Sequence, residues 1–384
     1  MGAFKTVVTY SLLSLAAFVT ATPVSKRTIP ATDYDVVIVG GGPSGLSALS
    51  GLSRVRRNSL LIDSGTYRNL NTRHINDVIG LDGIAPWEFR ARVHQQLAQY
   101  PGANMKNGTI TSITKEGEIF TSTDAEGNVY TSRKIVLATG VVDVLPDTPG
   151  VKENFARGIY WCPWCDGWEH RDQPFGILGS IVDVLGAVEE VITINKDIIA
   201  FVNGTQTDAN IAALNEKSPG WDVKLAKYGV QIENRTITAI ERVQDGGGIN
   251  RNETTDEEFD LFNVVLEDGQ KVSRSAFITN FKTKQQSYLG LGLGVQYYSE
   301  KMDVITGTTE TAAPGVFAVG DGNSDNSTNV PHAMWTGKRA AVKIHIELEK
   351  EYSATLVQKR DEMELLDIMG RDVEDLWEST FQKN

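Results

Sequence analysis

Short apolar runs, glycine-rich turns and helix-like stretches alternate in the first part of the chain. Residues 34–39 (YDVVIV) form an apolar run of strand length that is rich in β-branched residues. A glycine-rich turn follows at 40–45, then a helix-like stretch at 46–52 and a second apolar run at 59–62. The order strand, turn, helix, strand predicts a βαβ unit with parallel strands.

The turn at 40–45 reads GGGPSG and has the Gly-x-Gly-x-x-Gly spacing typical of dinucleotide-binding folds. The first glycine permits the tight turn, the second lets a pyrophosphate approach the backbone, and the third lets the helix pack on the strand. The helix N-terminus would present N–H groups to the phosphates, and the acid that ends the second run could accept from ribose hydroxyls. We expect the dinucleotide to be bound by Gly40, Gly42, Pro43, Ser44, Gly45 and Asp63.

Similar strand-and-turn patterns recur later in the chain. Residues 134–140 (KIVLATG) and 314–321 (PGVFAVGD) each form an apolar run that ends in a turn of small residues or an acid, and a helix is predicted from about 333 to 348. Between them, the runs at 175–179 and 197–202 are predicted strands flanking a helix. The pattern predicts an α/β protein in which one α/β domain interrupts another.

The N-terminus is typical of a secretory signal peptide. One positive charge precedes an apolar stretch at 7–19, and Val19-Thr20-Ala21 supplies small residues suited to a signal peptidase. Lys26-Arg27 is a dibasic pair suited to pro-peptide cleavage. This apolar stretch is too short for a membrane span and no later segment approaches that length, so we expect no membrane association. We predict a signal peptide at 1–21 and a pro-segment at 22–27.

Five Asn-x-Thr sequons agree with export, at Asn107, Asn203, Asn234, Asn252 and Asn326. No retention signal follows the final residues, Lys383-Asn384, so we expect a secreted, extracellular glycoprotein. The net charge of −12 and the pI near 5.0 argue against a nucleic-acid partner, which would require a basic surface.

The chain contains two cysteines, Cys162 and Cys165, inside the string YWCPWCDGWEH at 160–170. A structural disulfide, half of a zinc site and a redox couple would each explain such a pair. A disulfide that closes so small a loop removes little unfolded-state entropy, and secreted domains stapled by disulfides carry more cysteines. A zinc site would need two further ligands, and none of the five histidines has the spacing of a zinc half-site.

The string CPWCDG at 162–167, together with the turns at 40–45, 134–140 and 314–321, resembles the low-molecular-weight thioredoxin reductases. These belong to class II of the pyridine nucleotide-disulfide oxidoreductase family. The longer string, with Trp168-Glu169-His170, is similar to the fungal gliotoxin-type dithiol oxidases of that family. The likeness covers about residues 32–348 and favours the redox couple.

The resemblance implies two nested Rossmann-like dinucleotide-binding domains, FAD as the cofactor and a homodimer. The FAD-binding domain would occupy 28–150 and 276–384, and an NAD(P)-like domain that carries the cysteines would occupy 151–275. In the family, the second flavin motif is an "ATG" turn, and the acid of the third bonds the ribityl chain. These motifs correspond here to Ala138, Thr139, Gly140, Gly320 and Asp321.

The resemblance also implies roles for the residues of the cysteine motif. Cys165 would be the sulfur next to the flavin, Cys162 would meet the substrate, and Asp166 would act as acid and base. His170 and His332 are candidates for a second proton relay. Alternative interpretations remain: Asp166 could simply form a turn, and each histidine, like the tryptophans at 161, 164 and 168, could serve in packing. We expect no metal site.

One motif departs from the reductase pattern. A reductase needs a second Gly-x-Gly-x-x-Gly/Ala turn for NADPH, but the corresponding stretch, 179–184, reads GSIVDV. Ile181 and Val184 replace its second and third small residues, and no Lys or Arg occurs from 197 to 216 to hold a 2′-phosphate. We therefore expect the second domain to keep its fold and to have lost its nicotinamide.

Without nicotinamide as donor, a dithiol substrate would reduce the cysteine pair, and electrons would pass through FAD to dioxygen, giving hydrogen peroxide. The sequence thus predicts a secreted FAD-dependent dithiol oxidase whose substrate is a small molecule or a peptide. Three alternatives stay open: an NADPH-dependent disulfide reductase, a flavin oxidase of a non-thiol metabolite, and a flavin-binding structural or sensor protein without turnover.

Overall fold

The structure is a computed structural model that describes residues 29–305 and 307–381, with side chains described as far as Val357. The signal peptide predicted at 1–21 and the pro-segment at 22–27 lie outside these residues. Residues 30–349 form one compact unit, and helix α8 (Val330–Phe381) continues from it into a second unit. Among the described helices, none combines the length and the apolar character that crossing a bilayer requires.

A seven-stranded sheet forms the first layer of the 30–349 unit, in the order β3-β2-β1-β6-β5-β4 with β21 paired to β6. The strands β3, β2, β1, β6 and β21 run parallel, whereas β4 and β5 form an antiparallel extension. The strands are β1 (Tyr34–Val39), β2 (Ser59–Asp63), β3 (Ala103–Asn107), β4 (Ile110–Glu116), β5 (Ile119–Asp124), β6 (Val129–Leu137) and β21 (Val316–Ala318).

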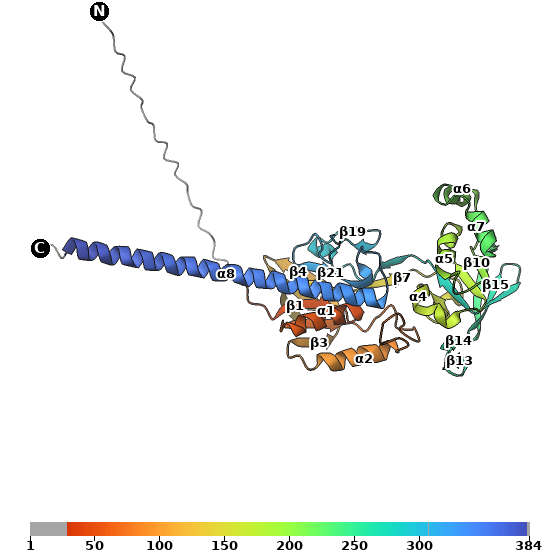
Figure 1. The fold of residues 1–384 in the computed structure, drawn as a ribbon, viewed down its shortest axis with the longest axis horizontal. Coiled ribbons are helices and arrows are strands. Elements are labelled where there is room, and N and C mark those ends of the chain that lie inside the picture. The colour runs from red at the N-terminus through yellow and green to blue at the C-terminus, as the bar shows by residue number, and fades with distance from the viewer. Residues whose placement is uncertain (1–28, 306, 382–384) are drawn as a thin grey trace, which may run out of the picture. The chain divides into compact units, whose positions relative to one another are not determined.

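One face of this sheet is covered by α1 (Pro43–Arg54) and the first turns of α8 (Figure 1). Leu46 and Leu49 of α1 pack with Ile344 of α8 over the buried side chains of β1. The two helices approach closely where a Cβ on Gly337 would lie 2.0 Å from the backbone oxygen of Ser44. This contact fixes the start of α8 beside the start of α1. A further helix, α2 (Pro86–Leu97), follows later in the chain.

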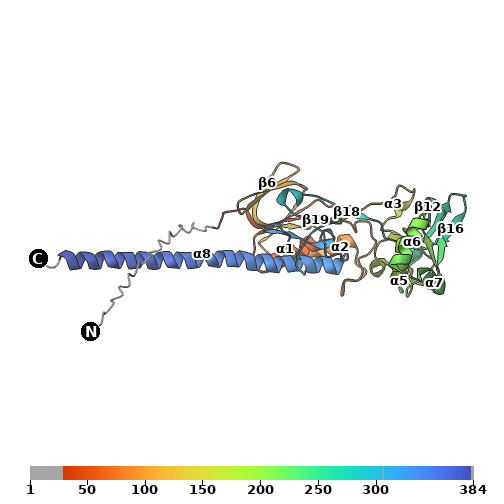
Figure 2. The same cartoon turned by 90° about the horizontal axis from the view of Figure 1, so that it is seen from above.

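A second, five-stranded parallel sheet has the order β11-β10-β9-β17-β8. Three helices pack on one of its faces and an antiparallel three-stranded sheet, β12-β15-β16, packs on the other (Figure 2). The elements are β8 (Ile159–Tyr160), β9 (Phe175–Leu178), α5 (Val184–Val191), β10 (Ile198–Phe201), α6 (Asp208–Lys217), α7 (Trp221–Tyr228), β11 (Gln231–Glu233), β12 (Ile237–Gln244), β15 (Leu261–Leu266), β16 (Lys271–Arg274) and β17 (Ala276–Thr279).

The chain leaves the second sheet later than the boundary expected at 275. Strand β17 lies between β8 and β9 in that sheet and pairs with both. Its four residues are all buried, as expected for a parallel strand in the interior of a sheet. The two crossings between the sheets are β7 (Val141–Asp143) and β18 (Thr283–Gln285), which pair antiparallel. The second domain is therefore inserted between these two strands.

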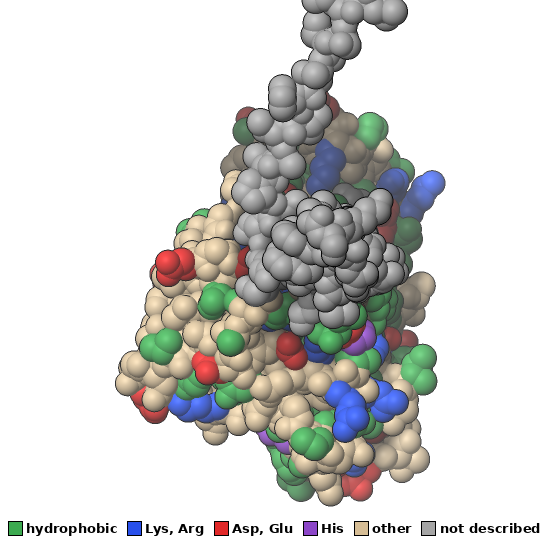
Figure 3. Space-filling model, turned by 90° about the vertical axis from the view of Figure 1, so that its left-hand side faces the viewer, with side chains coloured by type: hydrophobic (Ala, Val, Ile, Leu, Met, Phe, Trp, Pro, Cys, Tyr) green, Lys and Arg blue, Asp and Glu red, His purple; other side chains and the backbone are tan. Residues whose placement is uncertain are grey.

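The polar, glycine-rich stretch 245–258 contains a small hairpin of β13 (Arg251–Asn252) and β14 (Glu257–Glu258). Its last residue, Glu258, is buried. The remaining short elements are α3 (Val151–Asn154), α4 (Pro163–Asp166), η1 (Trp168–His170), η2 (Ile181–Asp183), η3 (Gly248–Asn250), η4 (Leu291–Leu293), β19 (Tyr297–Tyr298), β20 (Lys301–Met302) and η5 (Gly320–Gly322). On the face drawn in Figure 3, basic and acidic side chains are scattered among uncharged ones.

Candidate active site

A cleft opens at the carboxyl ends of the central strands of the first sheet. The turns that follow β1, β6 and β21 meet there, because these strands are parallel neighbours and their ends share one edge. The first residues of α8 and the cysteine motif complete the cleft. Of the residues predicted to bind the cofactor, the cleft is lined by Gly40, Gly42, Pro43, Ser44, Ala138, Thr139, Gly140 and Asp321.

The glycines of the first turn differ in what surrounds them. Gly40 has φ +112°, and a Cβ there would lie 2.3 Å from the carbonyl oxygen of Ala138. A Cβ on Gly45 would lie 2.0 Å from the Gly40 carbonyl oxygen, so Gly45 packs the helix on the turn and does not line the cleft. A Cβ on Gly42, by contrast, would meet nothing within 4 Å. The backbone at Gly42 is open to the cleft, as pyrophosphate binding requires.

Asp63 lies beside this turn but does not line the cleft. Its Oδ1 accepts from the Gly65 amide at 2.9 Å, and its Oδ2 accepts from the Tyr67 hydroxyl. Burial, together with the Asp63 carboxylate, raises the pKa of Tyr67. In this structure, therefore, the acid predicted to bind ribose holds the loop 64–69, and residues of that loop line the cleft instead: Ser64, Thr66, Tyr67, Arg68 and Asn69.

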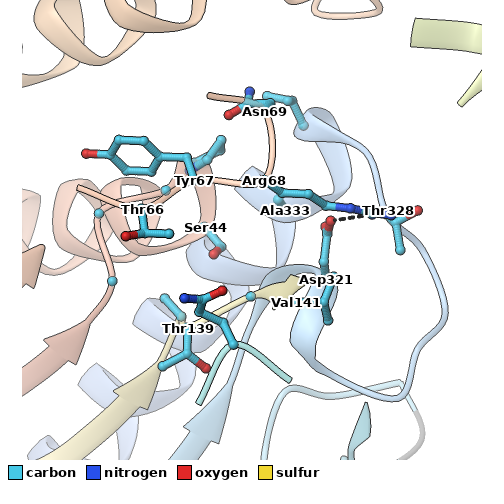
Figure 4. A pocket seen from close by; sticks show the side chains of 18 of the residues that line it. Ser44, Thr66, Tyr67, Arg68, Asn69, Thr139, Val141, Asp321, Thr328 and Ala333 are labelled. Atoms are coloured by element: carbon cyan, nitrogen blue, oxygen red, sulfur yellow. Dashed lines mark hydrogen bonds and ion pairs between the residues drawn. The ribbon is translucent and has the colours of Figure 1, made fainter. Parts of the chain in front are cut away.

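Asp321 projects into the cleft from η5 and is paired with Arg68 at 3.0 Å (Figure 4). The Arg68 guanidinium also donates to both oxygens of Asp143, at 2.9 and 2.7 Å, and lies 4.6 Å from the ring centroid of Trp161. Burial of Arg68 opposes its charge, but these two carboxylates outweigh it and raise the pKa of Arg68. Gly320 does not line the cleft; with φ +71°, it packs against Ser44.

The cleft also contains a hydroxyl without a protein partner. Thr139 lines the cleft, and its buried Oγ1 has no hydrogen bond to any described residue (Figure 4). A buried polar atom of this kind normally has a partner. The unpaired hydroxyl, the open backbone at Gly42 and the start of α8 together form a donor and acceptor set that fits a dinucleotide.

The two cysteines form a disulfide at the start of α4. Cys162 precedes the helix as its N-cap and is 9% exposed, whereas Cys165 lines the cleft. Trp161 lines the cleft too, but Trp164 and Trp168 are largely exposed. Cys165 thus adjoins the cleft that would hold the cofactor, whereas Cys162 does not line it.

Asp166 is buried and lines the same cleft as Cys165. Burial, and then the carboxylates of Glu169 and Glu258, raise the pKa of Asp166 well above its usual range, and Arg73 only partly offsets them. Burial of a carboxyl group in this way favours its protonated form. Asp166 can therefore donate a proton next to the disulfide.

The two candidate histidines do not line the cleft. His170 is fully buried, with Nδ1 3.1 Å from the Asp166 carbonyl oxygen and Nε2 3.1 Å from Asp260 Oδ2. Nε2 of His332, on α8, is 2.7 Å from Asp325 Oδ2, and the His332 ring is tilted against that of Trp335 at a centroid distance of 5.5 Å. His170 thus supports the cysteine motif from behind, and His332 lies outside the cleft wall.

His170, Glu258 and Asp260 place metal-ligand atoms within 4.8 Å of one another. Arg73, however, pairs with Glu258 and with Asp260, and Arg242 also pairs with Asp260. Burial opposes ionisation of Asp260, but hydrogen bonds from His170 and Arg73 outweigh it and lower the pKa of Asp260. Guanidinium groups therefore balance the charge of this cluster.

The second nucleotide-type turn, between β9 and α5, has a different structure from the first. A 3-10 turn, η2, precedes α5, and the amide of Ile181 donates to Thr205 Oγ1 at 2.9 Å. The Ile181 side chain is fully buried in the core that α5 and α7 share. Its place in the motif suggests a side chain that faces the ligand, but the structure turns it into the core. Asp183 places a carboxylate at the start of α5, where the helix dipole favours a phosphate.

Comparison with known proteins identifies the class of protein. Residues 34–337 match the family described as pyridine nucleotide-disulphide oxidoreductase, and the chain belongs to that family. It is a thioredoxin reductase-like oxidoreductase of a family whose members usually bind FAD. The fold of two nested Rossmann-like domains, of the low-molecular-weight thioredoxin reductase type, is confirmed.

Among individual proteins, the chain is 49% identical to a "Probable thioredoxin reductase" of Arthroderma benhamiae, over 91% of each chain. It is 28% identical to "Thioredoxin reductase tcpT" of Claviceps purpurea, over 79% of this chain and 90% of the relative. A solved oxidoreductase from Agrobacterium tumefaciens is 26% identical with TM-score 0.69, covering 82% of this chain and 98% of that one. The family assignment drawn from the cysteine and glycine motifs is confirmed.

Proposed function

We propose that this chain is an FAD-dependent enzyme that oxidises a dithiol to a disulfide and passes the electrons to dioxygen, giving hydrogen peroxide. One contrast carries the proposal. A cysteine disulfide adjoins a cleft suited to a dinucleotide, while the only other nucleotide-type turn identified in the described residues has its amide bonded to Thr205 and a carboxylate at its helix start. Electrons would therefore enter through the disulfide.

FAD is the cofactor that fits the cleft. Gly42 and Ser44 would hold the pyrophosphate at the start of α1, and Asp321 would hold the ribityl chain, with Thr139 available to a further polar group. When bound, FAD supplies a two-electron acceptor that can react with dioxygen. The protein contributes the position of Cys165 at the cleft and the charge of its walls.

The thiol chemistry belongs to the protein and follows from the disulfide. A substrate thiolate attacks Cys162 Sγ, which breaks the Cys162–Cys165 bond and releases Cys165 as a thiolate. The second substrate thiolate then attacks the mixed disulfide, so that the substrate leaves as a disulfide and Cys162 leaves as a thiolate. Asp166 lines the cleft beside Cys165, and burial favours its protonated form, so it is the candidate acid that would give Cys162 a proton.

A second candidate is an NADPH-dependent disulfide reductase. The names of the relatives favour it, since two of them are called thioredoxin reductases. In such an enzyme the electrons would pass through the same groups in the opposite direction, from NADPH to the flavin and then to the disulfide. The turn at 179–184 would then have to hold a nicotinamide dinucleotide, although the Ile181 amide is bonded to Thr205 and Asp183 places a carboxylate at the start of α5.

An anaerobic reduction experiment separates the two. The purified yellow protein is mixed with dithiothreitol and, separately, with NADPH, while the flavin absorbance is followed. We expect dithiothreitol to bleach the flavin, and air to restore it with release of peroxide, while NADPH has no effect. Rapid bleaching by NADPH would establish the reductase. If neither reagent bleaches the flavin, the remaining alternatives are a flavin oxidase of a non-thiol metabolite and a flavoprotein without enzymatic turnover.

We also propose that the enzyme is an exported glycoprotein that acts as a homodimer, with no nucleic-acid or membrane partner. Asn107, Asn203, Asn252 and Asn326 are exposed, as a glycan acceptor must be, whereas Asn234 is half-buried. Thr328, in the sequon of Asn326, lines the cleft, so a glycan there would crowd the cofactor. Expression in a secreting host, followed by N-terminal sequencing, glycopeptide mapping and light scattering, tests these points.

A further inference from the structure

A second, very small cavity lies behind Asp166. Its volume is about 10 Å³, which is roughly the space for one water molecule. Asp166 lines both this cavity and the cleft. The walls are formed by ionisable or polar side chains: Arg73, His74, Asn76, Tyr160, Asp166, Glu169 and Glu258. A water held there would touch groups able to exchange a proton with Asp166.

Glu169 is the unusual member of this wall. It is only 8% exposed, and its Oε1 accepts from Asn76 Nδ2 at 3.1 Å. Its Oε2 is buried and has no hydrogen-bond partner among the described residues. Asn76 also donates to the carbonyl oxygen of Cys165 at 2.8 Å, so the same amide fixes Glu169 and the redox motif. Glu169 thus lines the cavity and has one carboxylate oxygen without a protein partner, which a water or a proton could occupy.

The charges around Glu169 explain why it differs from its neighbours. Arg73 pairs with Glu258 and Asp260, and His170 contacts Asp260, so those two carboxylates are compensated. Glu169 and Asp166 have no ion-pair partner among the described residues, and burial raises the pKa of Glu169 as it does that of Asp166. Burial thus favours the protonated form of these two adjacent carboxyl groups, whereas the pKa values of Glu258 and Asp260 are lowered.

His74 connects the small cavity with the cleft, since it lines both. Arg251 donates to its Nε2 at 3.0 Å, so the ring proton lies on Nδ1, which is 3.3 Å from Glu258 Oε1. The His74 side chain is 17% exposed. It is therefore a point at which a proton from the cavity can reach solvent.

We propose that Glu169 is the proton-relay residue of the disulfide site and exchanges protons between Asp166 and the Glu258–His74 pair through one water. The inference rests on the proposed dithiol oxidation. Each exchange converts a substrate dithiol and the Cys162–Cys165 disulfide into a substrate disulfide, a Cys162 thiol and a Cys165 thiolate. Two protons leave the substrate sulfurs; one reprotonates Asp166 after it has protonated Cys162, and the other must leave the buried site. Glu169 carries it.

The test measures proton transfer directly. Anaerobic stopped-flow reduction by dithiothreitol is followed from pH 5.5 to 9, in H2O and D2O, for the wild type, Glu169→Gln and Glu169→Asp. Glu169→Gln keeps the shape but carries no proton, and we expect it to slow reduction about 10- to 100-fold, to enlarge the solvent isotope effect and to change the pH profile. Glu169→Asp should recover part of the rate and the wild-type profile. Glu189→Gln, on the exposed side of α5, is the matched control.

A merely structural role for Glu169 predicts another pattern. Both Glu169 variants would then be slowed alike, with the pH profile and the isotope effect of the wild type, and this result would overturn the proposal. Infrared difference spectra between the oxidised protein and the dithionite-reduced protein give a readout that needs no dithiol. We expect a protonated carboxyl band that shifts in D2O and is lost in Glu169→Gln. If dithiothreitol fails to bleach even the wild type, the proposed function fails, whereas absence of this band contradicts the relay itself.

Discussion

The two strand–turn–helix units of this chain, β1 to α1 and β9 to α5, share a plan but differ in their turns. In the first, α1 begins directly after Gly42, whose backbone is open to the cleft. In the second, a 3-10 turn intervenes, and the amide of Ile181 is bonded to Thr205. Both units retain buried strands and helices that pack on them. The core therefore preserves the same fold around two turns of different structure, and under the proposed function only the first turn binds a nucleotide.

The largest effect should come from matched glycine substitutions in the two turns. Gly40→Ala forces a side chain into φ +112° and to 2.3 Å from the Ala138 carbonyl oxygen, whereas a Cβ on Gly179 meets nothing within 4 Å. We expect Gly40→Ala to lose bound flavin and about 1–3 kcal/mol of stability or more. Gly179→Ala should retain both. The ratio of flavin to protein absorbance and urea unfolding measure this, and equal flavin loss in both variants would contradict the comparison.

Removal of a cysteine should separate electron entry from cofactor binding. Cys162 lies outside the cleft that would hold the flavin, so Cys162→Ser should keep its flavin absorbance. Reduction by dithiothreitol should fall by several orders of magnitude, because no disulfide remains to exchange. Dithionite, which reduces flavin without thiols, serves as the control. Normal dithiol turnover by this variant would instead support oxidation without the cysteine pair.

A stability measurement tests whether Ile181 belongs to the core or to a ligand site. Since its side chain is 0% exposed and packs with α5 and α7, Ile181→Ala should cost about 2–5 kcal/mol of unfolding free energy. The variant should still not be reduced by NADPH, because the Ile181 amide remains bonded to Thr205. A small loss of stability together with new NADPH-dependent bleaching would mean that the side chain had only blocked the cofactor.

The smallest effect should be a pH dependence of stability due to Asp166. Burial, followed by the carboxylates of Glu169 and Glu258, raises the pKa of Asp166 above its unfolded value of 3.8. The folded state thus binds more protons than the unfolded state, and this stabilisation, full below the unfolded pKa, is lost as the pH rises through the folded pKa. Urea midpoints should fall with rising pH more steeply in the wild type than in Asp166→Asn. Parallel curves would show that Asp166 ionises normally.

The sequence predicts the nested fold well because each strand–turn–helix unit is indicated by local signals. The apolar run at 34–39, the glycine spacing after it and the CPWCDG string lie within short windows, so that periodicity and turn chemistry suffice. The boundary at 275 was wrong by a few residues, because residues 276–279 could join either sheet on their apolar character alone. Pairing with β9 across about a hundred residues decides it.

Contacts between distant residues account for what the sequence did not predict. Arg68 contacts Asp321, and Arg73 contacts Glu258, across 253 and 185 residues of chain, with no periodic pattern to connect them. Asp63 was predicted to face the ribose, but its partners come from the loop directly after it. A local motif thus indicates which elements form a site, whereas the charge balance within it depends on the packing of loops.

The crossing strands β7 and β18 have a consequence for how such a chain can change over generations. Asp143 and Thr283 are register partners, so the inserted domain enters and leaves at adjacent points. A gene segment encoding it could therefore be exchanged, shortened or deleted, with the gap closed by a hairpin-sized loop and no rerouting of the remaining fold. An ancestor could discard one electron donor and acquire another by altering this module alone.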